Sequence, residues 1–220
     1  MRCLISMLKD LLQDKKLFIF DLDGTVTDTE PLHRISYDRA LRELCPGQTM
    51  EKEDFLKNYV GSSETVIYER MKGLRGIDFD DGEFFSVRID KLFEAVAEFG
   101  LDTAPFYKQL SEIFADREFI ALTSQRTEVL DRFRKVVDYG KIEKFISVAD
   151  KPYGKKEVLC DTENYLGYKA CECVIFEDFN RTLRIAKENG ILAIGVSHEL
   201  NALTCDDCDL LIDIHEPVEV

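Results

Sequence analysis

Short apolar runs that alternate with helix-like segments are the feature of this sequence that most restricts its fold. Each run is almost continuously hydrophobic, as expected for a parallel strand covered on both faces. The runs are residues 17–21, 118–122, 145–148, 173–176 and 192–196, with a sixth candidate at 210–212. Between them, residues 126–139 and 180–189 carry apolar side chains at helical spacing. This repetition predicts an α/β fold with a doubly wound parallel sheet.

One long segment interrupts the alternation. Residues 30–102 show helix-like patterning and no strand signal. We expect an inserted α-helical cap domain there, with residues 1–29 and 103–220 forming the core. Its place in the chain would set it over the carboxyl ends of the strands, where open α/β sheets bind ligands. The cations Arg70, Lys72 and Arg75 either meet an anionic group of a ligand or belong to a solvated helix face.

The charge balance limits the classes of partner. The 220 residues carry a formal net charge of −14. We therefore expect no nucleic acid as a partner, because a phosphate backbone requires a basic surface. No apolar run approaches the ~18 residues of a membrane span, and no signal-peptide cleavage site follows the apolar start. The expected location is the cytoplasm, and the absence of heptads leaves the oligomeric state open.

The seven cysteines do not form the pattern of a secreted disulfide framework. Cys205 and Cys208 form a C-x2-C pair, and Cys171 and Cys173 form a C-x-C pair. A four-sulfur zinc site is one interpretation, but C-x-C is not the usual spacing and Cys173 opens an expected buried strand. We expect reduced thiols.

The first expected strand ends in two aspartates, Asp21 and Asp23, followed by Gly24. Two carboxylates this close are costly at a buried strand end unless a cation binds between them or one stays protonated. The spacing suits one carboxylate that binds a hard cation and attacks phosphorus and another that transfers protons. Gly24 allows a sharp turn in which backbone amides can approach an anion.

The segment from Asp21 to Asp28 resembles the first motif of the haloacid dehalogenase superfamily, D-x-D-G-T-x-x-D, at every defined position. The resemblance implies a Rossmann-like core with a helical cap. It also implies a phosphatase or phosphomutase, because superfamily members that act on other bonds lack the second aspartate. Asp21 would be the nucleophile and Asp23 the proton donor and acceptor.

Three later segments are similar to the remaining motifs of the superfamily. Residues 118–125 match the second, so Thr123 would bind the transferring phosphoryl group and Ser124 would assist. The third requires a lysine just before a helix. Lys151-Pro152 copies the usual dipeptide, whereas Lys155 copies the spacing to the next strand, and we choose Lys155.

The fourth motif is similar to Glu177-Asp178, although the small residues that usually follow it are replaced by Phe179 and its neighbours. By this match Asp178 completes a Mg²⁺ site with the Asp21 carboxylate and the Asp23 backbone carbonyl, and Glu177 is a further or alternative ligand.

The expected function is therefore a Mg²⁺-dependent phosphatase that hydrolyses a small phosphorylated metabolite through an aspartyl phosphate. A phosphomutase similar to β-phosphoglucomutases is the main alternative. A non-catalytic ligand-binding relative is a second, and the presence of all the motif residues argues against it. The sequence does not identify the substrate.

Overall fold

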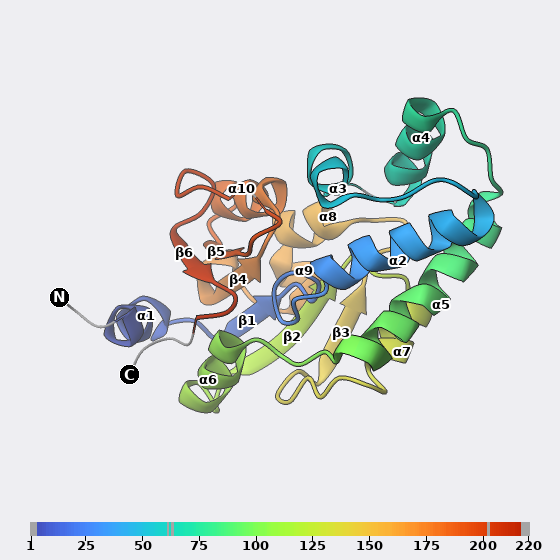
Figure 1. The fold of residues 1–220 in the computed structure, drawn as a ribbon. Coiled ribbons are helices and arrows are strands. Elements are labelled where there is room, and N and C mark those ends of the chain that lie inside the picture. Colours follow the sequence, from blue (N-terminus) through green and yellow to red (C-terminus); the bar gives the residue numbers. More distant parts are fainter. Residues whose placement is uncertain (1–3, 61, 63, 202, 217–220) are drawn as a thin grey trace. The chain divides into compact units, whose positions relative to one another are not determined.

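The computed structural model describes residues 4–60, 62, 64–201 and 203–216. The chain divides into two compact units, residues 1–28 with 102–220 and residues 29–101. The first contains the sheet (Figure 1). Its strands are β1 (Leu17–Phe20), β2 (Glu118–Thr123), β3 (Lys144–Ser147), β4 (Cys173–Glu177), β5 (Leu192–Ser197) and β6 (Leu210–Asp213).

All six strands are parallel, in the order β3-β2-β1-β4-β5-β6. The predicted doubly wound α/β fold is thereby confirmed. The order reverses at β1, because β2 and β3 lie on one side of it and β4 to β6 on the other. A crevice at such a switch point, outside the carboxyl ends of the strands, is where open α/β sheets bind their ligands.

The side chains of β1 alternate between two different cores. Leu17 and Ile19 belong to an aliphatic cluster that includes residues of α8 (Lys155–Cys160), α9 (Thr162–Leu166) and α10 (Asn180–Glu188). Phe18 and Phe20 lie in an aromatic cluster on the opposite face. There Phe18 contacts Phe114 at 5.1 Å between ring centroids, and Phe20 contacts Tyr107 of α6 (Pro105–Ile113) at 5.2 Å. Burial on both faces holds the end of β1 rigidly.

The remaining elements of this unit are short. They are α1 (Leu4–Leu12), α7 (Thr127–Phe133) and the 3₁₀ turn η1 (Ala170–Glu172). The helix predicted over residues 126–139 is wrong in its second half. Past Phe133 the chain turns, Val136 donates to the Phe133 carbonyl three residues back, and Tyr139 enters the core against Phe145 at 5.5 Å. The β-branched pair Val136-Val137 does not favour further helix.

The second unit is helical. It contains α2 (Glu30–Leu44), α3 (Lys52–Asn58), α4 (Glu64–Arg75) and α5 (Asp81–Phe99). Pro31 lies in the first turn of α2, where its missing N–H has no helical partner to lose. The Asp80 side chain caps α5 by accepting from the Glu83 amide at 2.9 Å. Buried side chains such as Tyr37, Phe55 and Phe84 give this unit its own core. Among the described helices of the whole chain, none is long and apolar enough to cross a membrane.

Candidate active site

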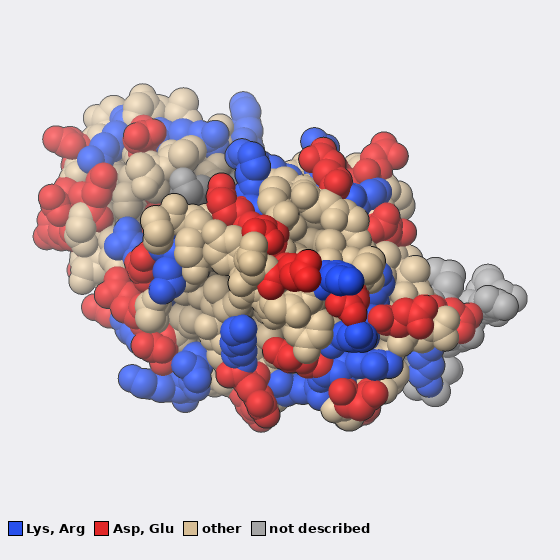
Figure 2. Space-filling model, turned by 180° about the vertical axis from the view of Figure 1, so that it is seen from behind, with Lys and Arg blue, Asp and Glu red and all other residues tan. Residues whose placement is uncertain are grey.

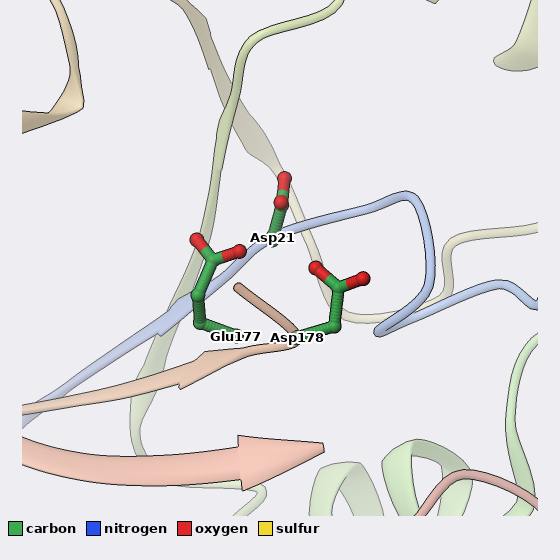
Figure 3. A group of neighbouring side chains, drawn as sticks. All are labelled: Asp21, Glu177 and Asp178. Atoms are coloured by element: carbon green, nitrogen blue, oxygen red, sulfur yellow. The ribbon is translucent and has the colours of Figure 1, made fainter. Parts of the chain in front are cut away.

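Three carboxylates meet at the carboxyl edge of the sheet. Asp21 follows β1 directly, and its amide extends the strand pairing by donating to the Phe176 carbonyl at 3.0 Å. Glu177 is the last residue of β4, and Asp178 follows it. One oxygen of each carboxylate lies within 4.8 Å of the others, and Figure 3 shows the three side chains gathered at the strand ends. The cluster lies at the switch point of the sheet.

Among the residues that the structure describes, one lysine contacts two of these carboxylates. Lys155 is the first residue of α8. Its Nζ lies 2.6 Å from Asp21 Oδ2 and 2.8 Å from Glu177 Oε2, and only 11% of its side chain is exposed. Lys151 is exposed and lines a separate cavity of about 430 Å³ beside β3. Of the two candidate lysines, the structure therefore brings Lys155 to the carboxylates.

Burial and mutual repulsion shift the pKa values of these groups. Burial raises the pKa of Asp21, and Lys155 only partly offsets this effect. Burial and then the Asp21 charge raise the pKa of Glu177 well above its ordinary value. Burial acts to lower the pKa of Lys155, but the charges of Asp21 and Glu177 outweigh it, and the lysine pKa rises. If all three carboxylates were ionised, their negative charge would exceed what Lys155 can balance, and the raised pKa values of Asp21 and Glu177 reflect this repulsion as well as burial.

The loop after β1 turns sharply at Gly24, whose φ is +66°. Its amide donates to the Thr27 carbonyl at 2.8 Å, and the Leu22 amide donates to Asp21 Oδ1 at 2.8 Å. These two amides therefore stabilise the loop and orient the Asp21 carboxylate. A side chain at position 24 would meet Asp178 Cγ at 2.9 Å, so only glycine fits without a shift.

The end of β2 and the loop after it contribute Thr123 and Gln125 to the site. Thr123 is buried, and its Oγ1 accepts from the Gln125 amide at 3.1 Å, which leaves the hydroxyl proton available for donation. The Gln125 side chain donates to Asp23 Oδ2 at 2.6 Å. The Gln125 backbone carbonyl accepts from the Ser147 hydroxyl at 2.6 Å, which fixes this loop to the end of β3. Ser124 is exposed.

Three residues of the site were missed in the sequence. Gln125 contacts Asp23, His198 Nε2 lies 3.0 Å from Asp178 Oδ2, and the Asn201 side chain donates to the Asp178 carbonyl at 3.3 Å. The signal that could have found them is their place directly after β2 and β5. In a parallel sheet, polar residues at that edge converge.

The carboxylate cluster fits a hard divalent cation. It offers only oxygen donors, which is the preference of Mg²⁺. The Glu177 Oε1 atom is buried without a hydrogen-bond partner, and a bound cation would compensate such an atom. Asp21, Glu177 and Asp178 form the only group of at least three potential ligand side chains in the described part of the chain. The cysteines form no such group there, and Cys173 and Cys208 instead pack in the aliphatic core.

The chain belongs to the haloacid dehalogenase-like hydrolase family, because the sequence profile of that family matches residues 18–196. The predicted superfamily resemblance is thereby confirmed. No curated protein sequence matches the chain.

Solved structures show the same fold. A protein assigned as a β-phosphoglucomutase from Thermotoga maritima is 24% identical, with a TM-score of 0.70 over 90% of this chain and 94% of that one. CbbY from Rhodobacter sphaeroides, solved with phosphate, is 16% identical, with a TM-score of 0.75 over 90% and 93%. A predicted phosphoglycolate phosphatase from Haemophilus somnus is 14% identical, with a TM-score of 0.71 over the same shares.

Proposed function

We propose that this protein is a Mg²⁺-dependent phosphatase that hydrolyses a small phosphorylated metabolite through an aspartyl phosphate on Asp21. The observation that carries the proposal is the position of Lys155 between the two buried members of a group of three carboxylates at the strand ends. A nucleophilic carboxylate, an excess of anionic oxygens and one fixed cation are what transfer of a dianionic phosphoryl group requires.

The carboxylates of Asp21 and Asp178 and the backbone carbonyl of Asp23 would hold Mg²⁺, with Glu177 as a further ligand or as the anchor of Lys155. When bound, the ion neutralises negative charge on the phosphoryl oxygens and on the nucleophile. Its charge also favours the ionised form of Asp21, against the burial that raises the pKa of this group.

The reaction then uses the two aspartates in turn. A carboxylate oxygen of Asp21 attacks phosphorus, and the bond from phosphorus to the ester oxygen breaks. Asp23 gives its proton to the departing oxygen, which leaves as an alcohol. Asp23 next takes a proton from a water molecule that attacks the same phosphorus, and this step restores Asp21 and releases phosphate. Gln125 holds the Asp23 carboxylate at 2.6 Å.

The charge that develops on the phosphoryl oxygens is stabilised by donors that are already fixed. Lys155 is held by its two carboxylate contacts, and the Thr123 hydroxyl has its acceptor side occupied by the Gln125 amide. Ser124 would bind the same group from the exposed side. Gly24 would let the substrate approach the backbone closely, because the absence of a side chain there leaves room beside Asp178. Such preorganised donors cost no reorganisation during the reaction.

A small anionic substrate suits the features of the chain. CbbY has been solved with phosphate and, as a mutant, with xylulose-1,5-bisphosphate.

On the face shown in Figure 2, Lys and Arg are interspersed among Asp and Glu, which does not favour nucleic acid as a partner. We propose a cytoplasmic location, since the six described cysteines are free thiols. Residues 29–101 would be the cap that selects the substrate.

The test is release of inorganic phosphate from a panel of phosphorylated metabolites, with and without Mg²⁺, by the wild type and Asp21→Asn. We expect Mg²⁺-dependent release that the folded variant loses. Near-wild-type phosphate release by the variant would refute the assignment of Asp21 as the nucleophile.

A phosphomutase is the second candidate, because the Thermotoga maritima relative is assigned as one. Isomerisation of a hexose phosphate without phosphate release would establish the phosphomutase activity. No activity in either assay would indicate a non-catalytic protein.

A further inference from the structure

The loop after β5 contacts the edge of the carboxylate cluster that Lys155 does not reach. It consists of residues 198–201, His-Glu-Leu-Asn. Resting on the proposed function, we propose that His198 and Asn201 are positioning residues that fix the Asp178 carboxylate for a divalent cation. Neither residue touches the reacting phosphoryl group in this account. They act through Asp178 alone.

The direction of the hydrogen bond between His198 and Asp178 follows from the other ring nitrogen. The Leu200 amide donates to His198 Nδ1 at 3.2 Å, so Nδ1 is an acceptor and carries no proton. The ring proton is therefore on Nε2, which donates to Asp178 Oδ2 at 3.0 Å. Only 1% of the His198 side chain is exposed. A buried ring held at both nitrogens can orient its acceptor.

Asn201 fixes the backbone of the same acidic residue. Its side-chain amide donates to the Asp178 carbonyl at 3.3 Å and to the Val196 carbonyl of β5 at 2.9 Å. Its Oδ1 accepts from the His198 amide at 3.2 Å. One loop thus holds both the main chain and the side chain of Asp178 and ties them to the sheet.

The loop after β1 limits Asp178 from another side. A Cβ atom at Gly24 would lie 2.9 Å from Asp178 Cγ and 2.9 Å from His198 Nε2. The Gly24 backbone is therefore packed against both partners of the hydrogen bond between His198 and Asp178. Because a carboxylate is planar, holding Oδ2 in this space sets the direction in which Oδ1 points.

The chemistry of the donor distinguishes Asp178 from Asp21. Asp21 is held by the ammonium of Lys155, whereas Asp178 is held by the N–H of a neutral ring. A second ammonium at Asp178 would repel a divalent cation, but an imidazole N–H orients the carboxylate without adding a full positive charge. Such outer partners of metal ligands contribute to metal affinity.

The test is Mn²⁺ binding, measured from the electron paramagnetic resonance signal of free Mn²⁺, so that it does not depend on turnover. The variants are His198→Leu and His198→Gln. His215→Leu is the control, since His215 is 62% exposed and lies beside Asp28. We expect His198→Leu to weaken Mn²⁺ binding by about 10–100-fold. His198→Gln, which can place an amide N–H near the position of Nε2, should recover most of the affinity, and the control should match the wild type.

A folded His198→Leu variant that binds Mn²⁺ within about threefold of the wild type would overturn the proposal, since outer partners of metal ligands typically contribute more. If leucine prevents folding, His198→Asn replaces it, because the shorter amide cannot reach Asp178. Asn201→Ala should weaken binding in the same direction. Equal Mn²⁺ affinities of His198→Gln and His198→Asn would also overturn the proposal.

Asp178→Asn separates this inference from the proposed function. Unchanged Mn²⁺ affinity in that variant would refute the metal site itself. Lost affinity in Asp178→Asn together with wild-type affinity in His198→Leu would refute only the positioning role. With a turned-over substrate, His198→Leu should raise the Mg²⁺ concentration needed for half-maximal rate, and kcat should largely recover at saturating Mg²⁺. A general loss of structure would not produce that recovery.

Discussion

Buried charges at the strand ends of the sheet unit are balanced less completely than buried charges in the helical unit. There Arg88 is 4% exposed, pairs with Glu64 and lies over the Tyr37 ring at 4.9 Å, and Arg75 pairs with Asp54. In the sheet unit, one lysine, Lys155, meets a cluster of three carboxylates. In the helical unit each of these two arginines has a carboxylate partner, and we call such pairs matched. At the strand ends three carboxylates share one lysine, and we call this group the open cluster.

This difference separates structural charge from functional charge. A matched buried pair needs no ion from solution, although removing one partner is costly. A cluster with excess negative charge raises carboxylate pKa values and is best stabilised by a cation from solution. The other cap cations lie nearer the surface: exposed Arg70 donates to the Asn58 carbonyl at 2.7 Å, and Lys72 pairs with Asp81 at 2.8 Å.

The largest expected effect comes from removing Lys155, the cation that contacts two carboxylates of the open cluster. Lys155→Met should lower kcat/KM by at least about 10²–10³-fold, because a fixed donor at the phosphoryl oxygens is lost. Lys151→Met is the matched control and should stay near the wild type. Phosphate release on the best substrate is the measurement. Equal losses in the two variants would remove the distinction between the lysines.

Breaking the matched pair of Arg88 and Glu64 should lower the stability of the folded protein. Arg88→Met removes the buried guanidinium that pairs with Glu64 and should lower the free energy of unfolding by about 3–5 kcal/mol. The double variant Arg88→Met with Glu64→Met should recover much of this loss, because both charges of the pair are then absent. Urea denaturation of the full chain measures both. A single variant as stable as the wild type would show that the pair is not structural.

A smaller effect is the pH dependence of metal binding to the open cluster. The raised pKa values of Asp21 and Glu177 mean that protons compete with the cation as pH falls. Mg²⁺ affinity should therefore decrease as pH is lowered from neutral, and Mg²⁺ should raise the unfolding temperature less. Calorimetric titration across pH measures this. The Arg88→Met and Glu64→Met double variant should show the same pH dependence, and a pH-independent affinity would contradict the account.

The sequence predicted the sheet because each strand is an almost continuous apolar run, as a strand covered on both faces requires. The helix predicted after β2 was too long. The apolar spacing continues past Phe133, but the chain turns there and buries Tyr139. Within the site, the spacing of Lys155 to β4 was informative because a packed helix fixes that distance. His198, Asn201 and Gln125 were missed, because their contacts depend on how three loops meet in space rather than on spacing along the chain.

The most direct test of the central claim is to trap the covalent intermediate. The enzyme is mixed with its best substrate and Mg²⁺, quenched in acid within the first turnover and reduced with borohydride, which converts an aspartyl phosphate to homoserine. Peptide mass spectrometry then locates the product. We predict homoserine at position 21 and at no other aspartate, with none in Asp21→Asn. Phosphate release without homoserine at position 21, or homoserine at another aspartate, would contradict the account.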